Sequence, residues 1–171
     1  MPSNIEIKAR VADPAHLRKL AEQLSDTPPK IIYQHDTFFA CPYGRLKLRA
    51  LSPDHGELIF YRRDDVADTK QSYYLIDRTS TPDQLRAVLS AALGVQQTVI
   101  KTRVLFMAGQ TRIHLDEVEG LGSFMELEVV LREGQLPEDG HRIARELMAA
   151  LEIRESDLLE GAYADMLGGK A

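Results

Sequence analysis

The chain has 171 residues, of which 44% are hydrophobic and 27% are charged, and its formal net charge is −5 at pH 7. This length and composition are typical of one globular domain with a sizeable core, which we expect to span residues 1–171. The negative charge argues against nucleic-acid binding. No apolar run reaches the roughly 18 residues of a membrane helix, so we expect no membrane partner. The single Cys41 excludes an internal disulfide, which fits the cytoplasmic location that we expect.

Eight segments alternate between apolar and polar residues with the two-residue period of a β-strand, and four others have the spacing of amphipathic helices. Two helical segments begin with a capping residue and a proline, Asp13 with Pro14 and Thr81 with Pro82, and Gly94 suits the left-handed position after a helix. In chain order, we expect strand 4–11, helix 13–25, a strand near 31–39, strands 45–51, 57–63 and 70–77, helix 81–94, strands 99–107, 110–118 and 124–132, and helices 141–151 and 156–166.

Most of these strands follow one another through short turns, as antiparallel strands do. Seven of the eight strands come before residue 120, and helices interrupt them only twice. The pattern therefore predicts an α+β fold around a large antiparallel sheet with flanking helices, and it leaves open whether the sheet closes into a barrel.

Charged residues recur at alternate positions of these strands, so they share one face of the sheet. Basic members outnumber acidic ones by eight to four, although the whole chain is negative. A sheet with one solvated face would also alternate, but so many cations on one face repel each other unless an anion lies among them. We therefore predict a polyanion site. Its basic residues are Lys8, Arg10, Arg45, Lys47, Arg49, Lys101, Arg103 and Arg112, and its acidic residues are Glu6, Asp116, Glu126 and Glu128.

The acidic residues point to a hard divalent cation. Glu126 and Glu128 lie two residues apart on one strand face, and Glu6 and Asp116 lie on faces of the same sheet. Oxygen ligands of this kind suit Mg²⁺ or Mn²⁺, which leaves other coordination positions to water and phosphate oxygens. A basic surface beside such a cluster is how proteins hold a metal-bound triphosphate.

The sequence resembles the CYTH family of triphosphate tunnel metalloenzymes, which contains class IV adenylate cyclases and thiamine triphosphatase. The resemblance covers nearly the whole chain, from NIEIKARV through GRLKLR, IKTRVLF and RIHLDEVEGLGSFMELEVV to AYADML. It implies an eight-stranded antiparallel closed β-barrel whose lumen binds a triphosphate. In the family's opening motif, Glu-x-Glu-x-Lys, Glu6 and Lys8 match the second and third positions. Asn4 replaces the first Glu and leaves the number of metal ions open.

The resemblance also implies roles for individual residues. A family lysine in the middle strands aligns with Arg62 or Arg63, of which Arg63 is preferred, and Lys70 is another candidate. Lys8, Asp116 and Glu126 are the expected catalytic residues. The expected metal ligands are Glu6, Asp116, Glu126 and Glu128. The expected phosphate-binding residues are Lys8, Arg10, Lys47, Arg49, Arg63, Lys70, Lys101, Arg103 and Arg112.

The expected partner is a nucleoside triphosphate or another organic or inorganic triphosphate, bound with Mg²⁺ or Mn²⁺. The nearest resemblance is to class IV adenylate cyclases, which convert ATP to cyclic AMP and pyrophosphate. With water as the nucleophile, the protein would instead be a triphosphatase, and Asn4 also suggests a non-catalytic triphosphate-binding protein. A homodimer is left open. His114 could contact phosphate or the acidic cluster, and Asp36 could cover a tunnel mouth, but a structural role is the preferred interpretation of both.

Overall fold

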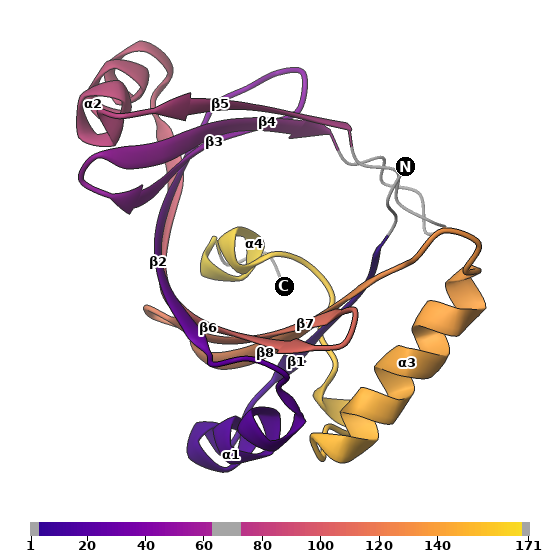
Figure 1. The fold of residues 1–171 in the computed structure, drawn as a ribbon. Helices are drawn as coiled ribbons and strands as arrows, with labels where there is room; N and C mark the ends of the chain where they lie inside the picture. Colours follow the sequence, from indigo (N-terminus) through magenta and orange to yellow (C-terminus); the bar gives the residue numbers. More distant parts are fainter. Residues whose placement is uncertain (1–3, 63–72, 169–171) are drawn as a thin grey trace. The chain divides into compact units, whose positions relative to one another are not determined.

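The computed structural model describes residues 4–62 and 73–168 (Figure 1). Its strands are β1 (Asn4–Arg10), β2 (Lys30–Phe39), β3 (Arg45–Ser52), β4 (His55–Arg62), β5 (Tyr73–Thr79), β6 (Val95–Ala108), β7 (Thr111–Val118) and β8 (Gly122–Val130). They form one eight-stranded antiparallel sheet in the order β1-β8-β7-β6-β2-β3-β4-β5. The predicted α+β fold is confirmed, with the strands close to their predicted positions.

Hydrogen bonds do not close this sheet within the described residues, because β1 and β5 are the two ends of its strand order. The closed hydrogen-bonded barrel that the resemblance implied is therefore not formed there. The second edge of β1 is partly covered by the C-terminal segment: Leu158 bridges to Ala9, and the Leu159 N–H donates to the Lys8 carbonyl at 2.9 Å. This pairing satisfies backbone groups that an edge strand would otherwise leave without a protein partner.

The first two helices begin as their sequences predict, and all three longer helices have a proline in the first turn. The Asp13 side chain accepts the His16 N–H at 3.0 Å, and Gly94 ends its helix at φ +77°. The third helix starts four residues earlier than expected, because the Asp139 carboxylate accepts the Leu136 N–H at 3.0 Å and caps that end. The helices are α1 (Pro14–Leu24), α2 (Pro82–Leu93), α3 (Pro137–Ala150) and α4 (Tyr163–Leu167).

The predicted helix over 156–166 is wrong. The structure instead has a single 3₁₀ turn, η1 (Glu155–Asp157), an extended stretch, and the short α4. The extended stretch exists because Leu158 and Leu159 pair with β1, which takes the place of helical hydrogen bonds. Gly161 then adopts φ +94°, a backbone conformation that glycine accommodates without strain, and lets the chain turn into α4.

The described chain divides into two compact units, which we treat separately. Unit 1 contains residues 4–32 and 102–162, and unit 2 contains residues 33–62, 73–101 and 163–168. In unit 1, α1 and α3 lie on the same side of β1, β7 and β8 (Figure 1). Their apolar residues bury the apolar face of these strands and leave the polar face on the other side. The core residues are Ala9, Leu17, Ala21, Phe106, Ile113, Met125, Leu127, Met148 and Leu151.

In unit 2, α2 packs on β3 and β4. The contact depends on Gly56, where an added Cβ would lie 2.8 Å from the Pro82 side chain and 3.0 Å from the Arg49 carbonyl oxygen. Phe39, Leu48 and Ile59 are buried in this unit. In the described part of the chain, no helix is long and apolar enough to cross a membrane.

Candidate functional site

The polar face of unit 1 brings predicted site residues from β1, β7 and β8 into register. Lys8 and His114 stand opposite Glu126 on its two neighbouring strands. Glu6 stands opposite Glu128 in the same way. Because cross-strand partners on one face have neighbouring Cβ atoms, the pairing places the predicted acidic and basic residues side by side.

Five of these side chains form the unit 1 cluster, which consists of Lys8, Arg103, His114, Asp116 and Glu126. The Arg103 guanidinium donates to both Asp116 oxygens at 2.7 Å and to Glu126 Oε2 at 3.0 Å. Lys8 Nζ lies 3.3 Å from Glu126 Oε1, and it also donates to the Gly161 carbonyl at 3.1 Å. The Asp116 side chain is fully buried, whereas a quarter of the Glu126 side chain is exposed. Asp116 therefore fixes Arg103, and Glu126 is the carboxylate that a ligand can reach.

His114 is buried, and its imidazole belongs to this cluster. Its Nδ1 lies 3.8 Å from Glu126 Oε2, too far for a hydrogen bond, and it has no hydrogen-bond partner among the described residues. Of the two interpretations of His114, the structure favours the one in which the ring adjoins the acidic cluster, next to the predicted catalytic carboxylate.

Asn4, Arg112 and Glu128 form a second polar group in unit 1. The Asn4 amide donates to Glu128 Oε1 at 2.6 Å, and Arg112 donates to the same oxygen at 3.0 Å. Asn4 therefore supplies a donor to this carboxylate where a glutamate would add a second negative charge. This hydrogen bond gives the departure from the family motif a local structural role.

The carboxylates suit a cation that is bound together with phosphate. Among the described residues, no group of three or more His, Cys, Asp or Glu side chains is placed to hold a metal ion. However, Glu126 and Glu128 project from alternate positions of β8, and Glu6 stands opposite Glu128. Mg²⁺ is commonly held by one or two carboxylates, with water and substrate phosphate oxygens completing its octahedron. The donor set fits that mode for Mg²⁺ or Mn²⁺.

The unit 2 cluster consists of Asp36, Lys47, Arg49, Lys101 and Tyr163. Arg49 Nε and Nη2 donate to the two Asp36 oxygens at 2.8 and 2.7 Å, and Lys47 Nζ donates to Oδ2 at 3.1 Å. The Lys101 ammonium is 4.8 Å from the centre of the Tyr163 ring, a cation–π contact. Lys47 and Arg49 thus share the Asp36 carboxylate, and the charge of Lys101, which is only 7% exposed, acts on Lys47.

This crowding shifts the protonation of two groups. Burial alone would raise the pKa of Asp36, but hydrogen bonds from Arg49 and the charges of Lys47 and Arg49 outweigh it and lower that pKa to about 2. Burial lowers the pKa of Lys47 to about 8; the charge of Asp36 opposes this shift, and those of Arg49 and Lys101 add to it. Lys47 is therefore a cation that loses its proton close to neutral pH.

Arg45 is engaged by the C-terminal helix within unit 2. Its Nη2 donates to both Asp165 oxygens at 3.2 and 3.3 Å, and more than a third of each side chain is exposed. Burial lowers the pKa of Arg45, but the neighbouring Tyr61 and Asp165 reverse this and raise it above its ordinary value, so Arg45 stays charged. Tyr163 and Asp165 thus both meet basic residues through α4.

The remaining predicted residues are more peripheral or undescribed. Arg10 is exposed and lies 5.3 Å from the centre of the Phe124 ring. Arg63 and Lys70 lie outside the described residues. Sequence reasoning missed the site contacts of Asp36, Tyr163 and Asp165. The alternation of residues within β2 could have placed Asp36 on the polar face of that strand. The contacts that Tyr163 and Asp165 make from α4 have no local sequence signal.

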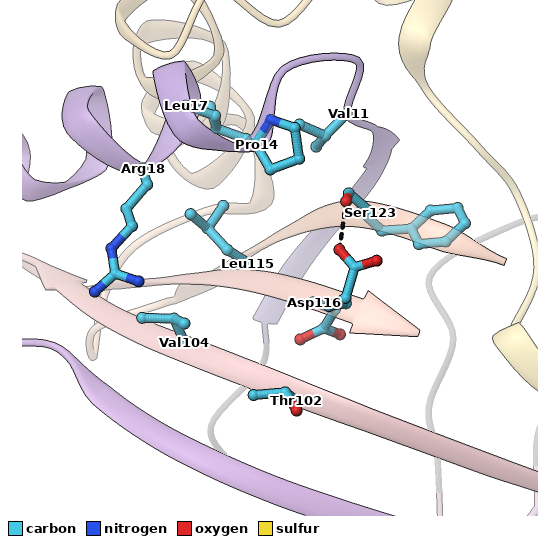
Figure 2. A pocket seen from close by; sticks show the side chains of 11 residues that line it. Val11, Pro14, Leu17, Arg18, Thr102, Val104, Leu115, Asp116 and Ser123 are labelled. Atoms are coloured by element: carbon cyan, nitrogen blue, oxygen red, sulfur yellow. Dashed lines mark hydrogen bonds between the residues drawn. The ribbon is translucent and has the colours of Figure 1, made fainter. Parts of the chain in front are cut away.

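Unit 1 also contains a largely apolar pocket. It is formed between α1 and the strands below it, with Pro14 and Leu17 facing Val104 and Leu115 (Figure 2). Of the predicted site residues, Asp116 alone lines it within the described chain. A mostly apolar lining does not suit a triphosphate.

Several solved structures share this fold. The PH1012 protein of Pyrococcus horikoshii OT3 aligns with a TM-score of 0.79 and 23% identity, over 95% of this chain and 98% of that chain. A candidate adenylate cyclase of Vibrio parahaemolyticus gives 0.71 and 21%, over 98% of both chains. HpAC1 of Hippeastrum gives 0.70 and 17%, over 100% of this chain and 97% of that chain, and is described as an adenylyl cyclase candidate with a dominant triphosphatase activity.

No curated protein matches the sequence. The CYTH domain family matches it over residues 3–163, nearly the full length of the chain. The predicted resemblance is confirmed by this match, and the fold of the related structures agrees with it. The chain therefore belongs to the CYTH domain family.

Proposed function

We propose that this protein is a metal-dependent enzyme that acts on a triphosphate. The observation that carries the proposal is the gathering of basic side chains in the unit 2 cluster, where Lys47 and Arg49 both donate to Asp36 and the charge of Lys101 acts on Lys47. Burying like charges together is costly unless an anion compensates them. A triphosphate brings several negative charges in a compact chain, which is the anion that such a cluster suits.

The basic side chains of both clusters would bind phosphate oxygens. In unit 1, Lys8 and Arg103 hold their positions through Glu126 and Asp116. In unit 2, Lys47 and Arg49 hold theirs through Asp36. Of the other predicted ligands, Lys101 and Arg112 have partners in the structure, Arg10 is exposed, and Arg63 and Lys70 complete the proposed set.

Glu126, Glu128 and Glu6 would hold Mg²⁺ or Mn²⁺ together with the substrate. When bound, the cation would neutralise phosphate charge that develops as a bond to phosphorus breaks. Asp116 was also a candidate ligand, but both of its oxygens accept hydrogen bonds from Arg103. We therefore place Asp116 in the site as the residue that orients Arg103, with Lys8 and Glu126 closest to the chemistry.

Two reactions fit this arrangement. In the cyclase reaction, the ribose 3′-hydroxyl oxygen of ATP bonds to the α-phosphorus, the bond to the bridging oxygen breaks, the hydroxyl proton is lost, and pyrophosphate leaves. In the triphosphatase reaction, a water oxygen bonds to the terminal phosphorus, the bond from that phosphorus to the bridging oxygen breaks, the water gives up a proton, and orthophosphate and the diphosphate remainder are the products. The cyclase has the nearer sequence resemblance, whereas HpAC1, with the same fold, is described with a dominant triphosphatase activity. Asn4 keeps a non-catalytic triphosphate-binding protein as a further candidate.

The test is a product analysis. The purified protein is incubated with ATP, GTP, thiamine triphosphate or tripolyphosphate, with Mg²⁺, Mn²⁺ or a chelator, and the products are identified by chromatography. Cyclic AMP with pyrophosphate supports the cyclase, and orthophosphate without cyclic AMP supports the triphosphatase. Tight tripolyphosphate binding with no turnover under either cation would make the protein a binding module, and absence of both binding and turnover would refute the proposal.

A further inference from the structure

Asp36 is a buried anion next to several cations, and it is not among the residues that the sequence predicts to bind phosphate or metal. It stands directly opposite Arg49 in the β2–β3 register. The pairing uses Arg49 Nε and Nη2 and leaves Nη1 outside the pairing. A planar guanidinium held at two points by one carboxylate has a fixed orientation, so the direction of its remaining N–H groups is fixed as well.

Exposure increases from the carboxylate to its partners. The Asp36 side chain is 7% exposed, that of Lys47 is 15% and that of Arg49 is 21%. A ligand from solvent therefore reaches the cations before the carboxylate. An exposed carboxylate beside these cations would repel a phosphate, whereas a buried one can offset their mutual repulsion from the protein side.

Lys47 depends strongly on this carboxylate. Among the described residues, the charged or titratable groups that act on it are Asp36 from β2, Arg49 on its own strand β3, Tyr61 from β4 and Lys101 from β6. Asp36 is the anion of this set, and Tyr61 meets Lys47 through its ring face at 5.7 Å. Removing the charge of Asp36 would leave the Lys47 ammonium beside two cations in a buried position, which favours loss of its proton.

We propose that Asp36 is a positioning residue for triphosphate binding, which orients the Arg49 guanidinium and holds the Lys47 ammonium in place without contacting the ligand. This inference rests on the proposed function and adds a residue to it. Asp36 acts through its two partners, so its loss reduces phosphate affinity and also changes the pH range over which phosphate binds.

The experiment measures binding of inorganic tripolyphosphate by calorimetry from about pH 6 to about pH 9, a range that spans the titration of Lys47 near pH 8. It compares the wild type with Asp36→Asn and with Asp77→Asn, an exposed control on β5. Wild-type affinity should fall as pH rises through about 8, where Lys47 loses its proton. Asp36→Asn should bind about tenfold more weakly at pH 7, with its fall in affinity shifted to lower pH, because the charge that holds both Arg49 and Lys47 is removed. Asp77→Asn should match the wild type.

An NMR titration of the lysine side chains supplies a readout that needs no ligand. Lys47 should titrate near pH 8 in the wild type and at lower pH in Asp36→Asn. A purely structural role would lower stability without moving the pH profile of the folded protein. Should Asp36→Asn not fold, Asp36→Glu keeps the charge but displaces it by one methylene, and it should weaken binding several-fold while retaining the wild-type pH dependence.

The outcomes separate the two claims. The positioning role is overturned if Asp36→Asn keeps the affinity and pH profile of the wild type. If Asp36→Asn does not fold, full wild-type affinity in Asp36→Glu overturns it instead. Either result leaves the proposed function standing. A wild type that does not bind tripolyphosphate at any pH would overturn the proposed function, and the positioning role with it.

Discussion

Lys8 and Glu126 are cross-strand partners on β1 and β8, and their charged groups lie 3.3 Å apart. Glu126 also accepts a hydrogen bond from Arg103 at 3.0 Å, so one carboxylate holds two of the predicted phosphate-binding cations. In the proposed complex, a triphosphate with its metal ion would offer alternative partners, anions for Lys8 and Arg103 and a cation for Glu126. Glu126 is thus the residue at which the ion pairs of the protein and the proposed ligand compete.

Replacing Glu126 with glutamine should therefore abolish most of the metal-dependent turnover. The amide keeps the size of the side chain but has no charge to offer a cation, and we expect a loss of about 10²–10³-fold, the range found for removing one preorganised electrostatic group. Stability should fall modestly, by about 1 kcal/mol, because two partly exposed cations lose their partner. Steady-state rates and urea unfolding measure both effects.

Glu119→Gln is the matched control for this substitution, since Glu119 is exposed in the turn between β7 and β8. It should retain wild-type rates and stability. A Glu126→Gln variant that keeps near-normal turnover would remove Glu126 from the catalytic site.

Replacing Asn4 with aspartate should strengthen metal binding. The amide of Asn4 donates to Glu128, and Glu6 stands opposite Glu128 on the same face. A third carboxylate there would repel the other two without a cation and attract a cation strongly, so we expect Mn²⁺ affinity to rise by about tenfold, since affinity follows the number of charged ligands. Titration of Mn²⁺, followed by its electron paramagnetic resonance signal, measures the change.

Asn4→Ala separates the added charge from the lost hydrogen bond. It removes the donor to Glu128 without adding a carboxylate, and its Mn²⁺ affinity should stay within about twofold of the wild type, because the number of charged ligands is unchanged. Equal Mn²⁺ affinity in Asn4→Asp and the wild type would show that position 4 lies too far from the cation to act as a ligand.

The strands were predictable because alternation is imposed by local geometry and by burial of one face. The helix starts at Pro14 and Pro82 were predictable for a similar reason, since capping residues and proline act within one turn. The end of the chain was not predictable in this way. Residues 156–166 have helical spacing, but Leu158 and Leu159 pair with β1, a contact between residues about 150 positions apart that no local pattern reveals.

The same distinction applies to the site. The polar face and the pairing of Lys8 with Glu126 follow from alternation once the strand register is known. The role of Asp36 does not, because an aspartate in an aromatic strand suits core packing equally well until Arg49 is found opposite it. The resemblance to a family predicted which residues belong to the site. The residue with which each charged side chain pairs became known only from the structure.

Asp36 should contribute stability that is lost in strong acid. Its pKa is about 2 in the folded protein and 3.8 in the reference state, so the contribution is fully present above about pH 4 and disappears as the pH falls through 2. The shift corresponds to about 2 kcal/mol at neutral pH. The difference in unfolding free energy between the wild type and Asp36→Asn should therefore shrink between pH 4 and pH 2, as measured by urea unfolding. A difference that stays constant over this range would show that the Asp36 charge does not stabilise the fold.

Replacing Lys47 with methionine should stabilise the protein while weakening phosphate binding. The charged form of Lys47 is disfavoured in the folded state, because burial lowers its pKa from 10.5 to about 8, with Arg49 and Lys101 adding to the effect. Methionine has a similar length, carries no charge and can pack against the neighbouring Phe38 and Tyr61 rings. We expect a gain of about 1–3 kcal/mol in unfolding free energy at pH 7, as this shift implies.

The pH dependence of that gain identifies its cause. The cost of charging Lys47 is fully present below pH 8 and fades as the pH rises towards 10.5, so the advantage of Lys47→Met should fade over the same range.

At pH 7 the variant should also lose most of the rise in melting temperature that tripolyphosphate with Mg²⁺ gives the wild type, because a ligand stabilises only the state that binds it. Lys19→Met, at an exposed position of α1, should change neither quantity. A less stable Lys47→Met variant with an unchanged ligand response would show that Lys47 serves the fold and not the phosphate.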